Sequence, residues 1–566
     1  MRDLQGSRRL KFSATLLVAS CLAVSTFGQG NSPSSEPVIG SQNTATADPA
    51  IPRPHTKPCV VQLFDNLAFA DFNIKTFQYT PPADCPGPWA KVVFVGDFNV
   101  TAGVQYDRTA QISVGYVNVF YGTTPEPSAT FGPSWHVERD LTDYSALFKS
   151  EESGEANIGN LVNSTYTGII YGTAKIEFYP PDFFGPAPKT ADQVLPLPDA
   201  SGGAALLASA TSQLSQSFTL PKNIERAYLD VFAQGQNTDE FWYTNAPNDV
   251  ANELEEYGGS GFRETEISID GKPAGVAPVY PWIFTGGIDP FLWVPIPGVQ
   301  TLNFVPYRVD LTPFAALLSN GEPHTVALSV YNDDYYFLAT STLLLYLDHG
   351  SEQVTGELTQ NTVGAPNPSV VENLTTGTGG SITGTVTVGS NRQFEVAGYV
   401  NTSHGRVVTT VQQSVDFSNI QQYDINGPLY VENVTQGTKV SSKTTTRDGF
   451  VVLETTRNFS YPLVVDITEA FATDGGLSIA TTIQQKYETD ETHRLNGFLI
   501  YWSKLSNEVS PADTLLLNSS FEITGNEGQS SSQHYFFGNS VGQCYSRALT
   551  AANNVLTGVK NGQGCF

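Results

Sequence analysis

Two acidic residues, Asp107 and Glu240, are the side chains of this sequence that are best placed for acid–base chemistry. Each comes just after a strand-like segment, beside neighbours that would shift its affinity for a proton. Arg108 follows Asp107, and a positive neighbour favours the ionised carboxylate that a general base requires. Residues 241–243, Phe-Trp-Tyr, follow Glu240 and would reduce its hydration, which raises the pKa as a general acid requires. The two acids therefore predict one acid–base site.

An internal repeat indicates how these two acids could meet. Residues 108–115 resemble residues 263–271, and residues 140–148 resemble residues 310–318 in the same order. Such matches predict two tandem copies of one β-sandwich, with chance similarity between two β-domains as the alternative. A seam between the copies would bring the acids together in an interdomain cleft, where active sites are common.

Period-2 alternation of apolar and polar residues dominates the chain, as in 173–179 and 324–331, and predicts strands. We therefore predict an all-β fold, with two tandem jelly-roll-like β-sandwiches followed by a C-terminal β-rich domain. The last domain is rich in Thr, Ser and Gly, shows few clustered titratable groups, and is expected to serve packing, stability or substrate access. The predicted segments are a signal peptide at 1–28, a disordered leader or propeptide at 29–57, a first jelly-roll domain at 58–180, a linker at 181–215, a second jelly-roll domain at 216–350 and the C-terminal domain at 351–566.

The composition excludes several classes of function. The 566 residues include 29 Lys and Arg against 55 Asp and Glu, so the net charge is −26 and nucleic acid is not an expected partner. No metal-binding spacing and no Gly-rich nucleotide loop is present, so we predict neither a metal nor a cofactor. Residues 538–542 match Gly-x-Ser-x-Gly, but no Asp, Glu or His follows Ser540, so the serine-hydrolase order cannot be completed.

The N-terminus and the cysteines predict a secreted, extracellular protein. Basic residues precede an apolar run at 12–27 that is short for a membrane span, and we expect no membrane association. Cys21 would leave with the signal, and the remaining cysteines form an even set, which predicts the local disulfides Cys59–Cys85 and Cys544–Cys565. Seven Asn-x-Ser/Thr sequons predict N-glycosylation at Asn99, Asn163, Asn373, Asn401, Asn433, Asn458 and Asn518.

Residues 58–350 resemble the secreted plant and fungal peptide N-glycanase A family. The likeness lies in the segments Gln105–Ile112, Gly159–Gly168, Gly235–Asn245, Phe262–Gly271 and Trp293–Gly298. The resemblance implies an amidase that releases N-glycans from glycopeptides, with N-glycopeptides and denatured N-glycoproteins as partners. It further implies a monomer or a proteolytically nicked two-chain form. The family is similar to the bacterial peptide N-glycanase F, whose two jelly-roll domains hold a carboxylate site at their interface.

The same resemblance implies roles for individual residues. Asp107 becomes the principal catalytic carboxylate and Glu240 a second essential acid, whereas a third carboxylate of the bacterial enzyme falls near Asn163 and leaves that role open. Aromatic faces for sugar stacking and polar contacts to substrate are expected from Tyr106, Arg108, Asn163, Trp242, Arg263 and Trp293.

More ordinary interpretations stay open for each of these residues. An Asp-Arg step at a strand start is often a turn, tryptophans of β-domains are mostly core, and Arg263 is more typical of a structural ion pair. Two other functions also remain: a secreted glycosidase that uses the same carboxylates, and a non-catalytic glycan-binding β-sandwich protein.

Overall fold

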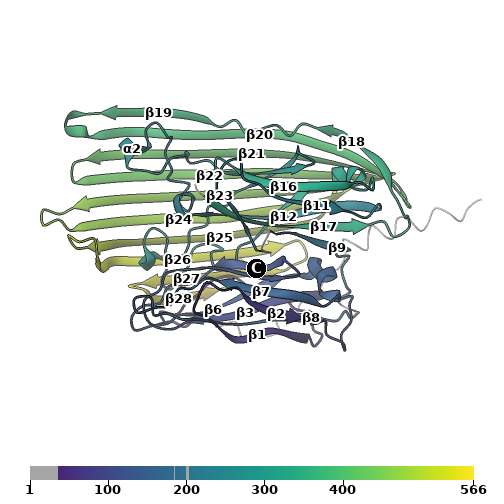
Figure 1. The fold of residues 1–566 in the computed structure, drawn as a ribbon, viewed down its shortest axis with the longest axis horizontal. Helices are drawn as coiled ribbons and strands as arrows, with labels where there is room; N and C mark the ends of the chain where they lie inside the picture. The colour runs from purple at the N-terminus through teal and green to yellow at the C-terminus, as the bar shows by residue number, and fades with distance from the viewer. Residues whose placement is uncertain (1–35, 184, 199–202, 335, 566) are drawn as a thin grey trace, which may run out of the picture.

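The computed structural model describes residues 36–183, 185–198, 203–334 and 336–565. The predicted signal peptide and Cys21 lie outside these residues. The described chain is built almost entirely of antiparallel strands, which confirms the all-β prediction. In Figure 1 the long strands of the C-terminal sheet run along the longest axis, and the purple strands of the N-terminal part lie toward the β28 edge.

The first sandwich is an eight-stranded jelly roll. Its two sheets have the orders β1-β8-β3-β6 and β2-β7-β4-β5, the pairing that arises when a long hairpin folds over into two Greek keys. Aromatic side chains fill the space between the sheets, with Phe94 and Phe98 stacked on Phe120. The strands are β1 (Cys59–Phe69), β2 (Lys75–Tyr79), β3 (Lys91–Val100), β4 (Thr109–Val114), β5 (Val117–Thr123), β6 (Ser134–Asp140), β7 (Glu152–Ile158) and β8 (Ile170–Tyr179), with a 3₁₀ helix η1 (Thr142–Lys149) after β6.

The second sandwich repeats this topology. Its sheets have the orders β10-β17-β12-β15 and β11-β16-β13-β14, strand for strand the order of the first. The matched segments at 108–115 and 263–271 form β4 and β13, and those at 140–148 and 310–318 form the ends of β6 and β15 with the short helices that follow. The repeat in the sequence is therefore a repeat in the fold. The strands are β9 (Gln193–Leu197), β10 (Ala205–Leu207), β11 (Leu214–Thr219), β12 (Ile224–Gln236), β13 (Glu264–Ile269), β14 (Lys272–Pro278), β15 (Tyr307–Asp310), β16 (Pro323–Tyr331) and β17 (Tyr336–Leu347). The short helices are η2 (Asn237–Asp239), α2 (Ala251–Leu254), η3 (Pro290–Trp293), η4 (Thr312–Phe314) and α3 (Ala315–Leu318).

The segment predicted as a linker, 181–215, contributes strands to the second sandwich. Strands β9 and β10 within it both pair with β17, and β11 begins at Leu214. The Pro- and Gly-containing sequence on either side of these short strands had suggested a connector, but their backbone groups are satisfied by the sheet.

The C-terminal part forms one eleven-stranded antiparallel sheet. Strands β20 to β25 are 19 to 22 residues long and alternate buried and exposed side chains, because one face packs on the second sandwich. One apolar core contains residues of both, so the boundary predicted at 350 separates two sheets but not two cores. The strands are β18 (Thr355–Asn361), β19 (Ser369–Thr376), β20 (Ile382–Thr402), β21 (Gly405–Asn426), β22 (Leu429–Asp448), β23 (Val451–Phe471), β24 (Leu477–Leu495), β25 (Phe498–Leu517), β26 (Ile523–Asn539), β27 (Cys544–Ala552) and β28 (Val555–Asn561), with a 3₁₀ turn η5 (Thr378–Gly380).

Residues 36–57, which we call the N-terminal strap, cross all three parts of the molecule. The backbone of Gly40 pairs with Leu556 of β28, and Ala45 donates to the carbonyl of Pro295 in the second sandwich. Asp48 accepts hydrogen bonds from Asn507 and Gln533 of the C-terminal sheet. The prediction of a disordered leader is therefore wrong for this stretch, because its polar groups find partners that are distant in sequence.

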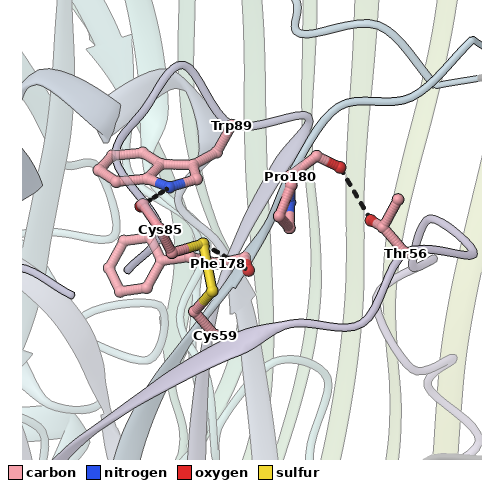
Figure 2. Close-up of a disulfide and its surroundings, with 6 residues drawn as sticks. All are labelled: Thr56, Cys59, Cys85, Trp89, Phe178 and Pro180. Carbon is pink, nitrogen blue, oxygen red and sulfur yellow. Dashed lines mark hydrogen bonds between the residues drawn. A yellow bond between two sulfur atoms is a disulfide. The ribbon is translucent and has the colours of Figure 1, made fainter. Parts of the chain in front are cut away.

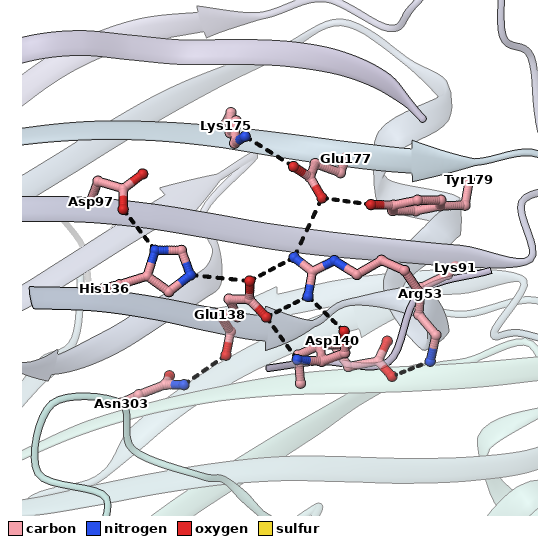
Figure 3. A network of polar contacts seen from close by, with 11 residues as sticks. Arg53, Lys91, Asp97, His136, Glu138, Asp140, Lys175, Glu177, Tyr179 and Asn303 are labelled. Atoms are coloured by element: carbon pink, nitrogen blue, oxygen red, sulfur yellow. Dashed lines mark hydrogen bonds and ion pairs between the residues drawn. The ribbon is translucent and has the colours of Figure 1, made fainter. Parts of the chain in front are cut away.

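The strap ends in a buried ionic network on the first sandwich. The Arg53 guanidinium makes two hydrogen bonds to Glu138 and reaches Glu177, and His136 bridges Glu138 and Asp97 (Figure 3). Burial lowers the pKa of His136, but the contacts with Asp97 and Glu138 outweigh this and raise it to about 9. A charged His136 and Arg53 thus neutralise the acids around them.

Both predicted disulfides are confirmed. Cys59–Cys85 joins the start of β1 to the loop before β3, beside Phe178, and the Trp89 indole donates to the Cys85 carbonyl (Figure 2). Cys544–Cys565 closes the last hairpin. All seven predicted glycosylation sites are at least partly exposed. Within the described residues, no helix has the length and apolar character that a membrane span needs.

Candidate active site

Three acids meet at the seam between the two sandwiches. Asp107 lies just before β4, Glu126 just after β5, and Glu240 in the turn after β12 and η2. The Asp107 amide donates to Glu126 Oε1 at 3.2 Å, and the Asp107 carboxylate accepts from the backbone N–H of Gly286 in the second sandwich. All three side chains are half-buried, so they combine a restricted environment with access to solvent.

Gly286 brings the second sandwich into direct contact with the acids of the first. A Cβ atom at this position would lie 2.3 Å from Glu126 Oε1 and 2.9 Å from Asp107 Oδ1. Any side chain would therefore displace one or both carboxyl groups. The absence of a side chain lets the backbone N–H reach Asp107.

The pKa of each of these three acids is raised. Burial raises the pKa of Asp107 to about 6, against the lowering effects of the Gly286 N–H and the Arg108 charge. Burial, and then the charge of Asp107, raise the pKa of both Glu126 and Glu240 to about 8. Arg108 was predicted to decide the charge of Asp107, but burial has the larger effect. The predicted rise at Glu240 has burial as its largest cause.

Near neutral pH the site therefore holds one carboxylate and two carboxylic acids. Such a separation of proton affinities supplies a general base and a general acid within one cleft. Among the residues that the structure describes, no group of three or more His, Cys, Asp or Glu side chains is arranged to hold a metal ion.

Two tyrosines lie beside the acids. The side chain of Tyr106 is 53% exposed, and its ring centroid is 5.4 Å from that of Tyr166. The Arg108 guanidinium lies over the Tyr106 ring and donates to the side chain of Gln105. Asn163 is exposed, and its side chain accepts from the amides of Thr165 and Tyr166. Asn163 thus shapes the turn that presents Tyr166, rather than pointing at the acids.

Three predicted substrate contacts are corrected by the structure. Trp242 and Trp293 are 2% and 3% exposed, and Arg263 is 2% exposed in a buried ion pair with Asp239. These side chains are buried in the core beneath the site and cannot reach a substrate. They still support the site: Asp239 precedes Glu240, and the Trp293 indole donates to the carbonyl of Gly287, next to Gly286.

The C-terminal sheet holds the two loops that carry Glu240 and Gly286. Asn419 and Gln421 of β21 donate to the carbonyl of Tyr243, and Gln421 donates also to that of Asn245. Gln485 of β24 donates to Pro281 and accepts from the amide of Val299. The sheet therefore satisfies buried backbone groups of the site loops, a role that the sequence did not reveal.

Sequence reasoning missed three residues of the site: Glu126, Tyr166 and Gly286. Glu126 did carry a signal, since it follows the apolar strand 117–123 and stands between two prolines. Asp107 likewise stands next to a strand, just before β4. Nothing in the sequence marks Gly286 as the glycine that meets both acids.

Comparison with known proteins supplies a family. The family model described as "Peptide N-acetyl-beta-D-glucosaminyl asparaginase amidase A" matches residues 49–364, and the model "PNGase_A C-terminal domain" matches residues 385–463. A Prunus dulcis protein named "Peptide-N4-(N-acetyl-beta-glucosaminyl)asparagine amidase A" is 30% identical over 401 residues, and the match covers 67% of this chain and 69% of that protein.

Two solved structures are similar over about half of the chain. PNGase F from Flavobacterium meningosepticum has a TM-score of 0.36 at 15% identity, covering 51% of this chain and 96% of its own. PNGF-II has a TM-score of 0.38 at 14% identity, covering 52% of this chain and 66% of its own.

Proposed function

Because the chain belongs to the peptide N-acetyl-beta-D-glucosaminyl asparaginase amidase A family, we propose that it hydrolyses the β-aspartyl-glucosaminyl amide bond of N-glycopeptides. The reaction releases the glycan as a glycosylamine and converts the asparagine to aspartate. The observation that carries the proposal is the group of Asp107, Glu126 and Glu240 at the seam, where one acid titrates below its two neighbours.

In the proposed mechanism, ionised Asp107 removes a proton from water as the water oxygen attacks the amide carbon. Protonated Glu240 gives its proton to the nitrogen as the carbon–nitrogen bond breaks. Positioned acid–base groups of this kind contribute roughly 10²–10⁴ each to the rate. Tyr106 offers an exposed ring face beside the acids on which a sugar can stack, and Tyr166 packs against that ring.

The titration of these groups sets the working range. Below a pH of about 6 Asp107 becomes protonated and the base is lost, and above about 8 Glu240 loses the proton that the leaving group needs. The rate should therefore follow a bell-shaped pH profile between these values.

Mass spectrometry of a defined N-glycopeptide, incubated in heavy-oxygen water, tests the proposal. The amidase converts the glycosylated Asn to Asp, and the new carboxyl carries one heavy oxygen atom. A glycosidase would leave N-acetylglucosamine or an intact Asn on the peptide, and a binding protein would leave the glycopeptide unchanged. Either of these results would refute the amidase.

The seam also bears on the form of the substrate. Peptide backbone must enter between the sandwiches for its Asn side chain to reach Asp107, so denatured N-glycoproteins and short glycopeptides should react faster than native ones. A single glycosylated Asn should be poor, because remote binding energy that positions the amide is lost. Equal kcat/KM for native glycoprotein, glycopeptide and glycosylated Asn would contradict this account.

We also propose that the protein is secreted to the extracellular medium as a monomer or a nicked two-chain form. The two disulfides support an oxidising compartment. Expression in a eukaryotic secretory host, followed by non-reducing electrophoresis and N-terminal sequencing of the medium, tests both points. Intracellular retention of the active protein would contradict secretion.

A further inference from the structure

Glu126 is the acid of the seam to which no role has been given. Its Oε1 accepts the backbone N–H of Asp107, and so lies within hydrogen-bond reach of the segment that presents the proposed base. It leaves β5 between Pro125, which is buried, and Pro127, so the backbone on both sides has a fixed φ. This arrangement holds Glu126 against Asp107 through a short, stiff connection.

Gly286 shows how close the two carboxyl groups are. Oxygen atoms of Glu126 and Asp107 lie 2.3 Å and 2.9 Å from the same point, the place where a Cβ of Gly286 would be. Two carboxylates so near each other resist being ionised together, because the second negative charge meets the first in a partly dehydrated site.

The charged and titratable groups that face Glu126 are Asp107, Arg108 and Tyr106. Arg108 favours the charged form, but its guanidinium donates to Gln105 and lies over the Tyr106 ring. Among the described residues no cation forms a salt bridge with Glu126. Burial, and then the Asp107 charge, therefore keep the proton on Glu126.

We propose that Glu126 is the positioning partner of Asp107: in its neutral form it fixes the Asp107 backbone, and it adds no negative charge where the amide carbonyl gains one. This inference rests on the proposed function. On ionisation of Glu126, a second carboxylate would oppose the oxyanion that forms as water attacks. Activity thus requires two groups, Glu126 and Glu240, to keep their protons while Asp107 has lost its own.

The pH profile of Glu126→Gln tests the proposal against wild type. Glutamine still accepts the Asp107 N–H through its amide oxygen but cannot ionise. On the alkaline side, log kcat/KM of the wild type should fall with a slope approaching two, and that of E126Q with a slope of one. Near the optimum E126Q should keep activity within a few-fold, whereas E126A, which loses the hydrogen bond, should lose roughly 10-fold or more in kcat with KM little changed. An unchanged alkaline slope in E126Q, or equal kcat in E126A and wild type, would overturn the proposal.

A second measurement does not depend on activity. Thermal unfolding of wild type, D107N, E126Q and the double variant is compared across the pH range. Because burial and Asp107 raise the pKa of Glu126 in the fold, wild type should lose stability as pH rises through about 8, and E126Q or D107N should each remove part of that loss. Additive effects at every pH would exclude the coupling. If the wild type is inactive but the titrations of Asp107 and Glu126 are coupled, the proposed amidase activity is refuted and the proposed pairing of the two acids is retained.

Discussion

The second sandwich makes two contacts that contain acids of raised pKa, and the two contacts use them differently. Its seam with the first sandwich holds Asp107, Glu126 and Glu240, all partly open to solvent. Its contact with the C-terminal sheet holds two acid pairs, Glu256 with Glu432 and Asp289 with Asp513. The prediction of few clustered titratable groups in the C-terminal part is wrong, since Glu432 and Asp513 pair across this contact and Arg457, Glu491 and His493 cluster within the sheet.

In each pair, one proton shared between the two carboxyl groups would avoid placing two negative charges side by side. Glu432 is 2% exposed and contacts Glu256, whose pKa is raised to about 7 by burial, while Tyr430 donates to Glu256. Asp289 is fully buried beside Asp513, and one oxygen of each lacks a donor. Burial raises the pKa of Asp289 to about 7.

A raised pKa alone therefore does not mark a catalytic group in this molecule. The seam acids differ from these pairs in the exposed Tyr106 beside them and in their separate proton affinities. The comparison predicts that changes at the seam alter turnover and changes at the sheet contact alter stability.

The largest effect should come from Asp107→Asn. The substitution is nearly isosteric and removes only the base, so turnover should fall by at least roughly 10⁴. The melting temperature and the circular dichroism spectrum should remain those of wild type. Turnover within ten-fold of wild type would remove Asp107 from the mechanism and the seam from its role.

Glu240→Gln should follow, with a loss of roughly 10²–10⁴ in kcat because the leaving nitrogen is no longer protonated. A glycopeptide that carries a better leaving group would recover part of that rate in E240Q but not in D107N. A merely twofold loss on the ordinary glycopeptide would make Glu240 a peripheral contact.

The sequence predicted the topology because each sandwich encodes it locally. Strands β4 and β13 have similar sequences, and so do the segments that follow β6 and β15. Because the similar segments occur in the same order in both halves, they predicted a repeated domain. The acids Asp107 and Glu240 could be found for the same reason, as each stands at a strand end.

The remainder depends on contacts that are distant in sequence. The sequence predicts Trp242 as a sugar-stacking residue, but Phe417 of the C-terminal sheet covers it in the structure. The sequence predicts the strap as a disordered leader because the residues that bind Asp48 and Arg53 are distant in sequence. Glu126 gains its meaning only from Asp107 and Gly286, which the fold brings to it.

Gln421→Ala should have a smaller effect on turnover and a clear one on stability. Gln421 is fully buried, and its loss leaves the carbonyl of Asn245 without this donor, which costs about 1–3 kcal/mol of unfolding free energy. The loosened loop should lower kcat a few-fold through Glu240. Gln412→Ala, on the exposed face of the same strand, is the control and should change neither. A Q421A variant with wild-type stability and wild-type kcat would contradict the proposal that the C-terminal sheet supports the loop of Glu240.

The smallest effect, and the sharpest contrast with the seam, should come from Glu432→Gln. The folded pKa of Glu256 and of Glu432 lies above the unfolded value, so the stability of the pair is present at acid pH and is lost as pH rises through about 7. Glutamine at 432 can donate to Glu256 without a shared proton, and the melting temperature should therefore fall by a few degrees less between about pH 5 and pH 8 than in wild type. Glu357→Gln, an exposed acid of β18, should keep the wild-type pH dependence. Since the partners of Glu432 are Glu256 and Tyr423 and not the three seam acids, kcat/KM of E432Q at its pH optimum should stay within twofold of wild type. A large loss of turnover in a folded E432Q would show that the acid pairs at the sheet contact take part in the chemistry. The distinction between a catalytic seam and a structural sheet contact would then be wrong.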